Sequence, residues 1–343
     1  MSSRTKSPTI VDIAKLAGVS IGTVSRVIND EASVKAEIRE AVQAQIRRLG
    51  YVPNSVAQSM RKRSTRTIGC IIRDIAVPEM AELVKAAQHA LQEADYTLLL
   101  VNSEYLVENE VRLARSLVRR RVDGLFWMLS SERELRLRRI LQDLSIPVVL
   151  LDRENIEKTD AVVVDHYNGT RAATEYLLNL GHRRIALITT SSEVYSGRER
   201  IRGYLEAHKA RGLEPSPELI RSHDAQANQG FRETSMLISD HETPTAIIVS
   251  PMGTLPEVLR ALRGRNLRIP EDVSLISEGD SEVAEFFSPP ISVIRWDLEE
   301  FGRSAAHFLL GRLQGRALGE PKMVSLPTEL LTRQSCAPPR KPT

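Results

Sequence analysis

Short apolar segments alternate with longer amphipathic ones from Arg66 onward, and this alternation restricts the fold more than any other feature of the sequence. The first series of apolar segments reads TIGCIIRD, YTLLLVN, VDGLFWM and IPVVLLD. A second series reads RRIALITT, TAIIVS and DVSLIS, with helix candidates near residues 198–211, 230–240 and 255–265. Buried strands that alternate with helices predict βαβ units and parallel sheets. The repetition predicts two similar α/β lobes, with a ligand crevice at the carboxyl ends of their strands.

The first 50 residues contain no segment of this kind and predict three short helices instead. Thr9 can cap the first helix, and Asp12 completes a variant of the capping box. Gly18 can end that helix in a tight turn, and Ser20 can cap the second. The apolar residues at helical spacing are Ile13, Leu16 and Ala17, then Val24, Val27 and Ile28, then Ile38, Val42, Ile46 and Leu49 before Gly50. Two helices joined by a glycine-containing turn predict a helix-turn-helix.

The second of these helices carries an unusual outer face. When its apolar residues point inward, the opposite face presents Ile21, Gly22, Ser25 and Arg26. Small residues allow close approach to base edges, and the Arg26 guanidinium can donate two hydrogen bonds to O6 and N7 of guanine. In a helix-turn-helix, the second helix is the one that enters the major groove of DNA. This helix is therefore predicted to read DNA bases.

The distribution of charge agrees with a polyanionic partner at this end of the chain. Residues 1–66 carry 12 Lys or Arg against 5 Asp or Glu, whereas the remainder carries 35 against 39. The overall net charge of +3 hides this contrast. A basic segment beside an acidic remainder indicates nucleic-acid binding, although an ordinary solvated helical face is an alternative interpretation of charge alone.

The segment YVPNSVAQSMRKRSTRT, residues 51–67, follows the third helix. Residues 54–60 can form about two helical turns, which are too short to be stable alone in water. Met60 could wedge between base pairs from the minor groove, while the basic residues that follow hold phosphates. The alternative interpretation is a basic, flexible linker.

Several other classes of protein find no support in the sequence. Apolar runs are too short for a membrane span, and MSSRTKSPT lacks the apolar stretch of a secretory signal. Two distant cysteines, Cys70 and Cys336, favour a reducing, cytoplasmic setting. No motif of a metal site, dinucleotide site or nucleophile elbow is present, so we expect neither an enzyme nor a cofactor.

TIVDIAKLAGVSIGTVSRVIN followed by YVPNSVAQSM resembles the headpiece and hinge of the LacI/GalR (lactose-repressor/galactose-repressor) family of bacterial transcription regulators. The ordered spacing matches from AGVS through to the YVPN hinge. The resemblance implies that Ile21, Gly22 and Arg26 read bases. It also implies that Met60 takes the place of an intercalating leucine and that Ala57 lies at the minor groove. The remaining DNA-binding candidates that match the family are Thr9, Ser20, Thr23, Ser25, Asn29, Tyr51 and Asn54.

The resemblance continues to the end of the chain through NGTRAATEYLLNLGHRRIALI, RERIRGY, PEDVSLI and PTELLTRQS. It implies a small all-α helix-turn-helix headpiece plus hinge helix, followed by a two-lobed α/β periplasmic-binding-protein-like core. The expected boundaries are residues 1–52 for the headpiece, 53–66 for the hinge helix and linker, 67–335 for the core and 336–343 for a tail. Within the core we expect a first lobe of about 67–180 and 295–321, and a second of about 181–294 and 322–335.

The positions where the family binds effectors are altered in this sequence. Glu79 and Met80 replace an aromatic pair that stacks on sugars, and Ala225 replaces a further aromatic. Arg73 is a candidate for a reason that does not depend on the resemblance, because it lies at the C-terminal end of the first predicted strand. The effector-binding candidates are Arg73, Glu79, Asn168, Arg200, Asp280 and Trp296.

Two arginines among these candidates favour an anionic ligand, such as a sugar acid or a phosphorylated sugar. The alternative is that Arg73 pairs with Asp74, Glu79 or Glu278 and meets no ligand. The functional expectation is a repressor that binds a near-palindromic operator as a dimer under control of a small-molecule effector. A regulator without an effector, whose core serves mainly for dimerisation, is the alternative. The tail QSCAPPRKPT has no apolar heptad to make a tetramer.

Overall fold

The computed structural model describes residues 8–51, 64–223, 229–239, 243–316 and 319–340. The chain divides into two compact units, Met1–Thr65 and Arg66–Thr343, and each is described here by itself. The predicted hinge residues Asn54, Ala57 and Met60, and the altered position Ala225, lie outside the described residues.

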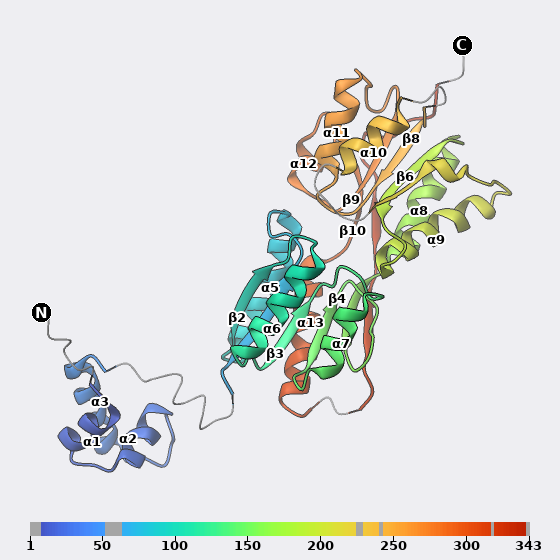
Figure 1. Cartoon of the computed structure of the whole chain (residues 1–343). Helices are drawn as coiled ribbons and strands as arrows, with labels where there is room; N and C mark the ends of the chain where they lie inside the picture. Colours follow the sequence, from blue (N-terminus) through green and yellow to red (C-terminus); the bar gives the residue numbers. More distant parts are fainter. Residues whose placement is uncertain (1–7, 52–63, 224–228, 240–242, 317–318, 341–343) are drawn as a thin grey trace, which may run out of the picture. The chain divides into compact units, whose positions relative to one another are not determined.

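The first unit is a three-helix domain of α1 (Ile10–Ala17), α2 (Ile21–Ile28) and α3 (Ala36–Leu49) (Figure 1). Its core is formed by the buried side chains of Ile13, Ala14, Val24, Val27 and Val42. The expectation for Leu16 is wrong, because this side chain is 50% exposed. The apolar stripe of α1 is centred between Ile13 and Ala14, and Leu16 lies to one side of it. Gly18 and Gly50 end α1 and α3 in the left-handed conformation, as their positions indicated.

The first lobe of the second unit contains a sheet in the order β11-β5-β4-β3-β1-β2, and all its strand pairs are parallel. Its strands are β1 (Thr67–Ile72), β2 (Thr97–Asn102), β3 (Gly124–Trp127), β4 (Val148–Leu151), β5 (Asp160–Val164) and β11 (Met323–Leu326). Helices α5 (Pro78–Glu93) and α13 (Leu298–Leu313) cover one face, and α6 (Val107–Arg119) and α7 (Leu135–Asp143) cover the other. Because both faces are covered, the central strands are apolar throughout rather than alternating.

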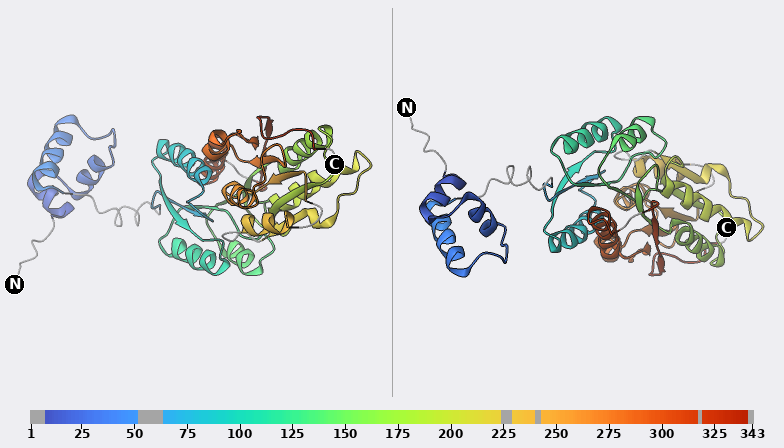
Figure 2. Two further views of the ribbon diagram at one scale, coloured as in Figure 1. Left: turned by 90° about the horizontal axis from the view of Figure 1, so that it is seen from above. Right: turned by 90° about the horizontal axis from the view of Figure 1, so that it is seen from below.

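The second lobe repeats this plan in the order β12-β10-β9-β8-β6-β7. Its strands are β6 (Ile185–Thr190), β7 (Ile220–His223), β8 (Ala246–Val249), β9 (Ser274–Glu278), β10 (Ser292–Arg295) and β12 (Glu329–Leu331), of which β12 alone pairs antiparallel. Its helices are α8 (His166–Asn179), α9 (Tyr195–Lys209), α10 (Gln229–Leu237), α11 (Leu255–Gly264) and α12 (Glu282–Phe286), with a 3-10 turn, η1, at Pro217–Leu219. Figure 2 shows helices on both faces of the sheets.

Two of the three expected crossings between lobes are displaced, and their boundaries need correction. The expectation kept residues 165–180 in the first lobe, whereas α8 packs against α9 and the second sheet, with Ala173 and Leu177 in that lobe's core. The first crossing therefore lies just after Val164. The expectation also moved residues 322–326 to the second lobe, whereas β11 pairs with β5.

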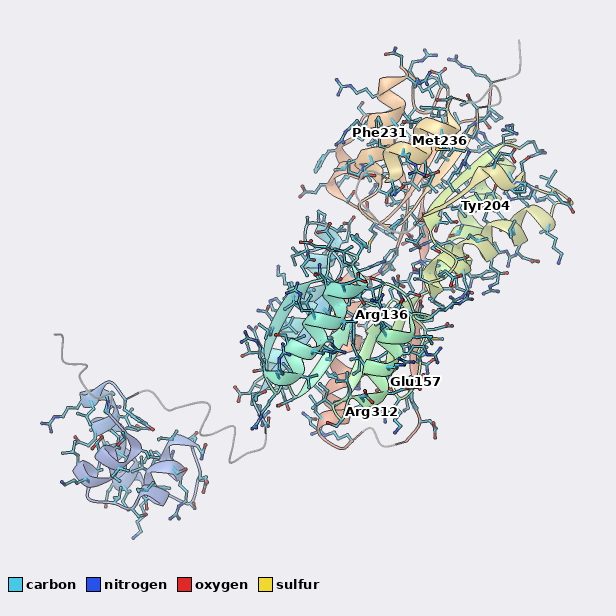
Figure 3. All side chains as sticks on the ribbon, viewed as in Figure 1. Arg136, Glu157, Tyr204, Phe231, Met236 and Arg312 are labelled. Atoms are coloured by element: carbon cyan, nitrogen blue, oxygen red, sulfur yellow. The ribbon has the colours of Figure 1, made fainter. Side chains whose placement is uncertain are left out.

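A buried carboxylate explains why β11 stays in the first lobe. Asp160, at the start of β5, accepts two hydrogen bonds of 2.8 Å from the guanidinium of Arg312. Arg312 belongs to α13 and is labelled in Figure 3. The same carboxylate accepts the backbone amide of Lys322, also at 2.8 Å. The segment expected to be a tail from residue 336 likewise joins the second lobe, because the Ala337 amide donates to Ser274 Oγ at 3.0 Å.

Candidate functional site

Helix α2 is held in place by its first residues and by its buried face. Ser20 caps it, since the side-chain oxygen accepts the Thr23 amide at 3.1 Å. The preceding helix begins with the expected capping box, in which the Thr9 amide donates to the Asp12 carboxylate at 2.9 Å. Val24 and Val27 of α2 are fully or almost fully buried in the three-helix core. These contacts fix which side chains of α2 face outward.

The outward face of α2 is small and basic, as the sequence predicted. Ile21, Gly22 and Arg26 are exposed, whereas Thr23 and Ser25 are half-buried. A methyl group placed on Gly22 would meet only Ser20 Oγ, at 3.7 Å, so the surface around it is open. Among the described residues, Arg26 makes no ion pair, and its Nε makes one long hydrogen bond of 3.4 Å to the Gly22 carbonyl. Its charge is therefore available to a partner.

The other DNA-binding candidates within the described residues lie around this helix in the same unit. Thr9, Ser20 and Asn29 are exposed, with Thr9 and Ser20 capping helices and Asn29 following α2. Tyr51 is half-buried, and its side chain packs against the core of the domain. The ring therefore stabilises the domain, and only part of it faces outward. Lys35 precedes α3 without a side-chain hydrogen bond to the helix.

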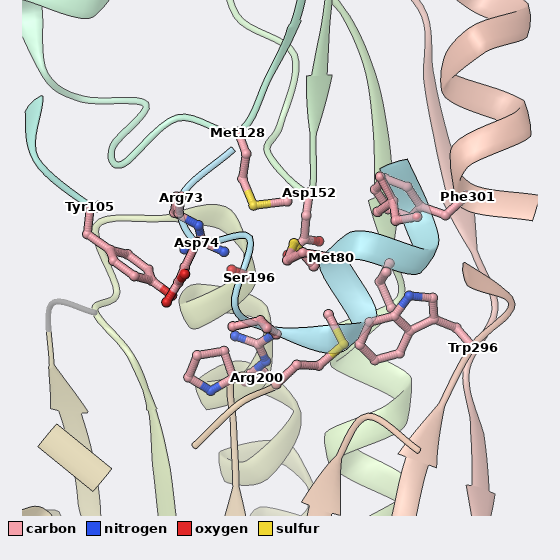
Figure 4. Close-up of a pocket in the computed structure, with 15 residues that line it drawn as sticks. Arg73, Asp74, Met80, Tyr105, Met128, Asp152, Ser196, Arg200, Trp296 and Phe301 are labelled. Atoms are coloured by element: carbon pink, nitrogen blue, oxygen red, sulfur yellow. The ribbon is translucent and has the colours of Figure 1, made fainter. Parts of the chain in front are cut away.

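A second candidate site is a cavity of about 30 Å³ between the two lobes of the core (Figure 4). It lies where the strands end, with Arg73 after β1, Asp152 after β4 and Met252 after β8. Its lining consists of Arg73, Asp74, Val77, Met80, Leu83, Tyr105, Met128, Asp152, Val164, Ser196, Arg200, Pro251, Met252, Trp296 and Phe301. The volume admits a few water molecules, so a larger ligand requires the lobes to separate slightly.

Three of the six effector-binding candidates line this cavity: Arg73, Arg200 and Trp296. Glu79, Asn168 and Asp280 do not. Glu79 is buried beside it on α5, and burial raises the pKa of its carboxyl group. Asn168 is exposed and donates to the Asp165 carboxylate at 2.6 Å. Asp280 forms ion pairs with Arg333 at 2.6 Å and Arg295 at 3.7 Å.

Arg200 belongs to a buried network that joins the two lobes. Its guanidinium forms an ion pair of 2.7 Å with Glu278 at the end of β9. His166, at the start of α8, binds Glu278 through Nδ1 and Asp152 through Nε2, both at 2.8 Å. Since Asp152 follows β4 of the first lobe, His166 connects a carboxylate from each lobe. Trp296 approaches the imidazole edge-to-face, with ring centroids 6.0 Å apart.

The pKa values in this network follow from its pairing. Burial disfavours the imidazolium of His166, as does the Arg200 charge, but the carboxylates of Asp152 and Glu278 outweigh both and raise the His166 pKa. Burial alone would raise the pKa of Asp152, yet His166 and the guanidinium groups of Arg200 and Arg153 hold it well below its usual range. Both effects favour a charged, paired network.

Arg73 differs from Arg200, because it is half-buried and makes no ion pair among the described residues. Its Nε is buried without a hydrogen-bond partner, and its guanidinium carbon lies 5.5 Å from the centroid of the Tyr105 ring. Burial, together with repulsion from Arg153, lowers the Arg73 pKa to about 10. The sequence offered Asp74, Glu79 and Glu278 as partners, and none of them forms an ion pair with it.

Sequence reasoning missed Asp152, His166, Tyr105 and Ser196. Asp152 had a visible signal, since it ends the apolar segment IPVVLLD as Arg73 ends the first one. No sequence signal marked His166. The residues around it, in DAVVVDH, do not show that this histidine lies between carboxylates from two lobes.

Comparison with known proteins decides what these two units belong to. Residues 9–54 match the family model "Bacterial regulatory proteins, lacI family", and residues 174–336 match the "Periplasmic binding protein-like domain". The chain is 34% identical to the HTH-type transcriptional regulator CelR of Thermobifida fusca, over 97% of this chain and 99% of that protein. The chain belongs to the lacI family of bacterial regulatory proteins. It is also 31% identical to the HTH-type transcriptional repressor PurR of Aliivibrio fischeri strain MJ11, over 95% of this chain and 98% of the relative.

Solved structures of lacI-family members agree with both parts of the fold. A Lac repressor dimer bound to operator and the anti-inducer ONPF superposes with a TM-score of 0.84 at 26% identity, covering 97% of this chain and 100% of that one. A CelR-cellobiose complex gives a TM-score of 0.72 at 33% identity, covering 96% and 99%. The relatives are DNA-binding regulators of transcription and not enzymes.

Two further observations concern only the described residues. No helix among them combines the length and apolar character that a membrane crossing requires. No cluster of three or more His, Cys, Asp or Glu side chains in that part of the chain is arranged to bind a metal ion.

Proposed function

We propose that this protein is a transcriptional repressor that binds a near-palindromic operator as a dimer and responds to a small molecule held between the lobes of its core. The observation that carries the DNA-binding part is the surface of α2. Its apolar face is buried, and its outer face combines the open surface at Gly22 with the charge of Arg26, which forms no ion pair within the described part of the chain. Since operator DNA lies in the bacterial cytoplasm, the proposal places the protein there.

Dimerisation follows from the way a single helix reads DNA. One α2 helix reaches only one half-site, so two helices related by a two-fold axis are needed for an operator of useful length. The Lac repressor structure similar to this chain is a dimer on its operator. Sedimentation at micromolar concentration should therefore give a dimer, and a stable tetramer would contradict this assembly.

The effector part rests on the cavity between the lobes. CelR, similar to this chain over almost its whole length, has been solved with cellobiose. A ligand that prefers one separation of the lobes shifts the protein between two states by its difference in affinity for them. The competing proposal is a core that only dimerises. Trp296 lines the cavity whereas Trp127 is buried in the first lobe, so a Trp127→Phe variant isolates the fluorescence signal for ligand titrations.

The readout by α2 is tested by Arg26→Ala on the full chain, with Arg48→Ala of α3 as a control that removes one exposed charge elsewhere. Operators are first selected from random DNA. Loss of a bidentate contact to guanine should weaken binding by about 1–3 kcal/mol per half-site and relax the preference at one base pair. The control should weaken specific and random DNA alike. Equal losses on specific and random DNA for Arg26→Ala would refute the role in base readout.

A further inference from the structure

Arg73 occupies the cavity wall without a counter-ion, which is unusual for a guanidinium removed from much of its water. It follows β1 directly and is brought to the cavity by the end of that strand. Its Nε is buried without a hydrogen-bond partner, and no carboxylate of the described residues forms an ion pair with it. A partly buried charge without a counter-ion destabilises the folded protein, and binding of an anion offsets this cost.

The other basic side chains in or next to the cavity lining already have partners. Arg200 is paired with Glu278, and His166 is held between Glu278 and Asp152. Arg153, which is fully buried, donates to the Leu129 carbonyl at 2.8 Å. Its guanidinium also lies 3.9 Å from the carboxylates of Glu132 and Asp152.

Asp74 is the one further carboxylate in the lining, and it is engaged by its own loop. Its Oδ1 accepts the Ala76 amide at 2.9 Å, and it forms no ion pair with Arg73. Figure 4 shows Arg73 and Asp74 on the segment after β1, with Tyr105 to one side and Met128 to the other. The cavity therefore presents one positive charge that its own side chains leave unmatched.

The rest of the wall indicates what kind of anion fits. Nine of the lining residues are apolar, namely Val77, Met80, Leu83, Met128, Val164, Pro251, Met252, Trp296 and Phe301. Asp152 and Arg200 line the cavity but are bound to other side chains. A sugar ring needs many hydrogen-bonding groups, and a buried hydroxyl without a partner weakens binding.

We propose that Arg73 is the charge-selecting anchor of this cavity, and that its ligand is a monoanionic organic acid whose carboxylate meets Arg73 while a largely apolar body contacts the methionine and aromatic side chains. A planar carboxylate matches the guanidinium in a bidentate pair. The sequence led us to expect an anionic sugar derivative as the ligand. The apolar wall of the cavity restricts that class to acids with few hydroxyl groups. This inference rests on the proposed effector site but not on the DNA-binding role of α2.

The test uses the full chain and carboxylates with matched neutral amides: acetate with acetamide, propionate with propionamide, and benzoate with benzamide. Thermal unfolding followed by tryptophan fluorescence reports binding, because a ligand of the folded state raises the melting temperature. Ionic strength is held constant with chloride. At least one carboxylate should stabilise the protein and bind about tenfold or more tightly than its amide.

Two variants separate this inference from its alternatives. Arg73→Gln should lose the carboxylate response and, without ligand, melt no lower than wild type, because it removes an unpaired charge. Arg303→Gln changes an exposed arginine of α13 and should keep the response. Lack of response to every carboxylate, equal response to acid and amide, or an unchanged response in Arg73→Gln would overturn the inference. Binding of the selected operator is measured on the same samples. It tests the DNA-binding role of α2 independently, because the ligand inference does not depend on that role.

Discussion

We expect the Glu278 carboxylate to contribute strongly to the free energy of unfolding, because three short contacts converge on this one buried group. The side chain is almost fully buried, accepts hydrogen bonds from His166 at 2.8 Å and Arg200 Nε at 3.1 Å, and pairs with Arg200 Nη2 at 2.7 Å. Glu278→Gln keeps the shape and one acceptor oxygen but leaves Arg200 without its carboxylate. Breaking a buried pair by removing one partner costs about 3–5 kcal/mol, a large share of the roughly 5–15 kcal/mol that stabilises a typical domain.

The matched control is Glu299→Gln on α13. Glu299 lies 3.3 Å from Arg303, with side chains 74% and 54% exposed, and such surface pairs contribute about 0–1 kcal/mol. Both variants are unfolded in urea, with far-UV circular dichroism and tryptophan fluorescence followed together. Both tryptophans lie in the core unit, so the fluorescence is insensitive to the headpiece. If Glu278→Gln lowered the free energy of unfolding no more than Glu299→Gln, the network would not stabilise the core as described.

His166, Gly22 and Thr9 each give a further testable expectation. The raised His166 pKa contributes stability that is complete below its ordinary value of 6.5 and is lost as pH rises through the higher folded value. In urea unfolding of the core, the free energy of unfolding of the wild type should therefore fall more steeply over that range than that of His166→Gln. Equal slopes would contradict this. Gly22→Ala should stabilise α2 by up to ~1 kcal/mol in hydrogen exchange, because the surface around Gly22 is open. The same change should weaken operator binding, because the proposed close approach to base edges leaves no room for the methyl group, and unchanged operator affinity would contradict that approach. Thr9→Ala should destabilise the headpiece by about 0.5–2 kcal/mol, measured by hydrogen exchange of α1; no change would rule out the capping box as a stabiliser.

The parts of the fold that were predictable have local causes. The caps at Thr9 and Ser20 and the glycine turn at Gly18 depend on residues within three or four positions of one another. The alternation of apolar strands and amphipathic helices likewise gave two α/β lobes. The crossings were misplaced because an amphipathic helix shows that one face is buried, without showing which sheet buries it. Strand β11 was also hard to assign to a sheet, because only Leu326 within it is buried.

The site was predictable only in part, for the same reason. Residues that end strands, such as Arg73, could be placed at the cavity from the sequence, because parallel strands end at a common edge. The direction in which each side chain points could not be predicted from the sequence. Asn168 contacts Asp165 and Asp280 contacts Arg333, so neither side chain lines the cavity. The pairing of Arg200 with Glu278 joins residues that are 78 positions apart in the sequence. No spacing rule reveals such a contact.

We propose above that α2 reads operator DNA from a two-fold symmetric dimer. Selecting DNA from a random pool with the full chain, and then sequencing what is bound, tests this most directly. We expect an inverted repeat whose two half-sites each contain a guanine, with the preference at that guanine relaxed symmetrically in Arg26→Ala. A pool that shows no sequence preference, or a single asymmetric site that Arg26→Ala leaves unchanged, would contradict it.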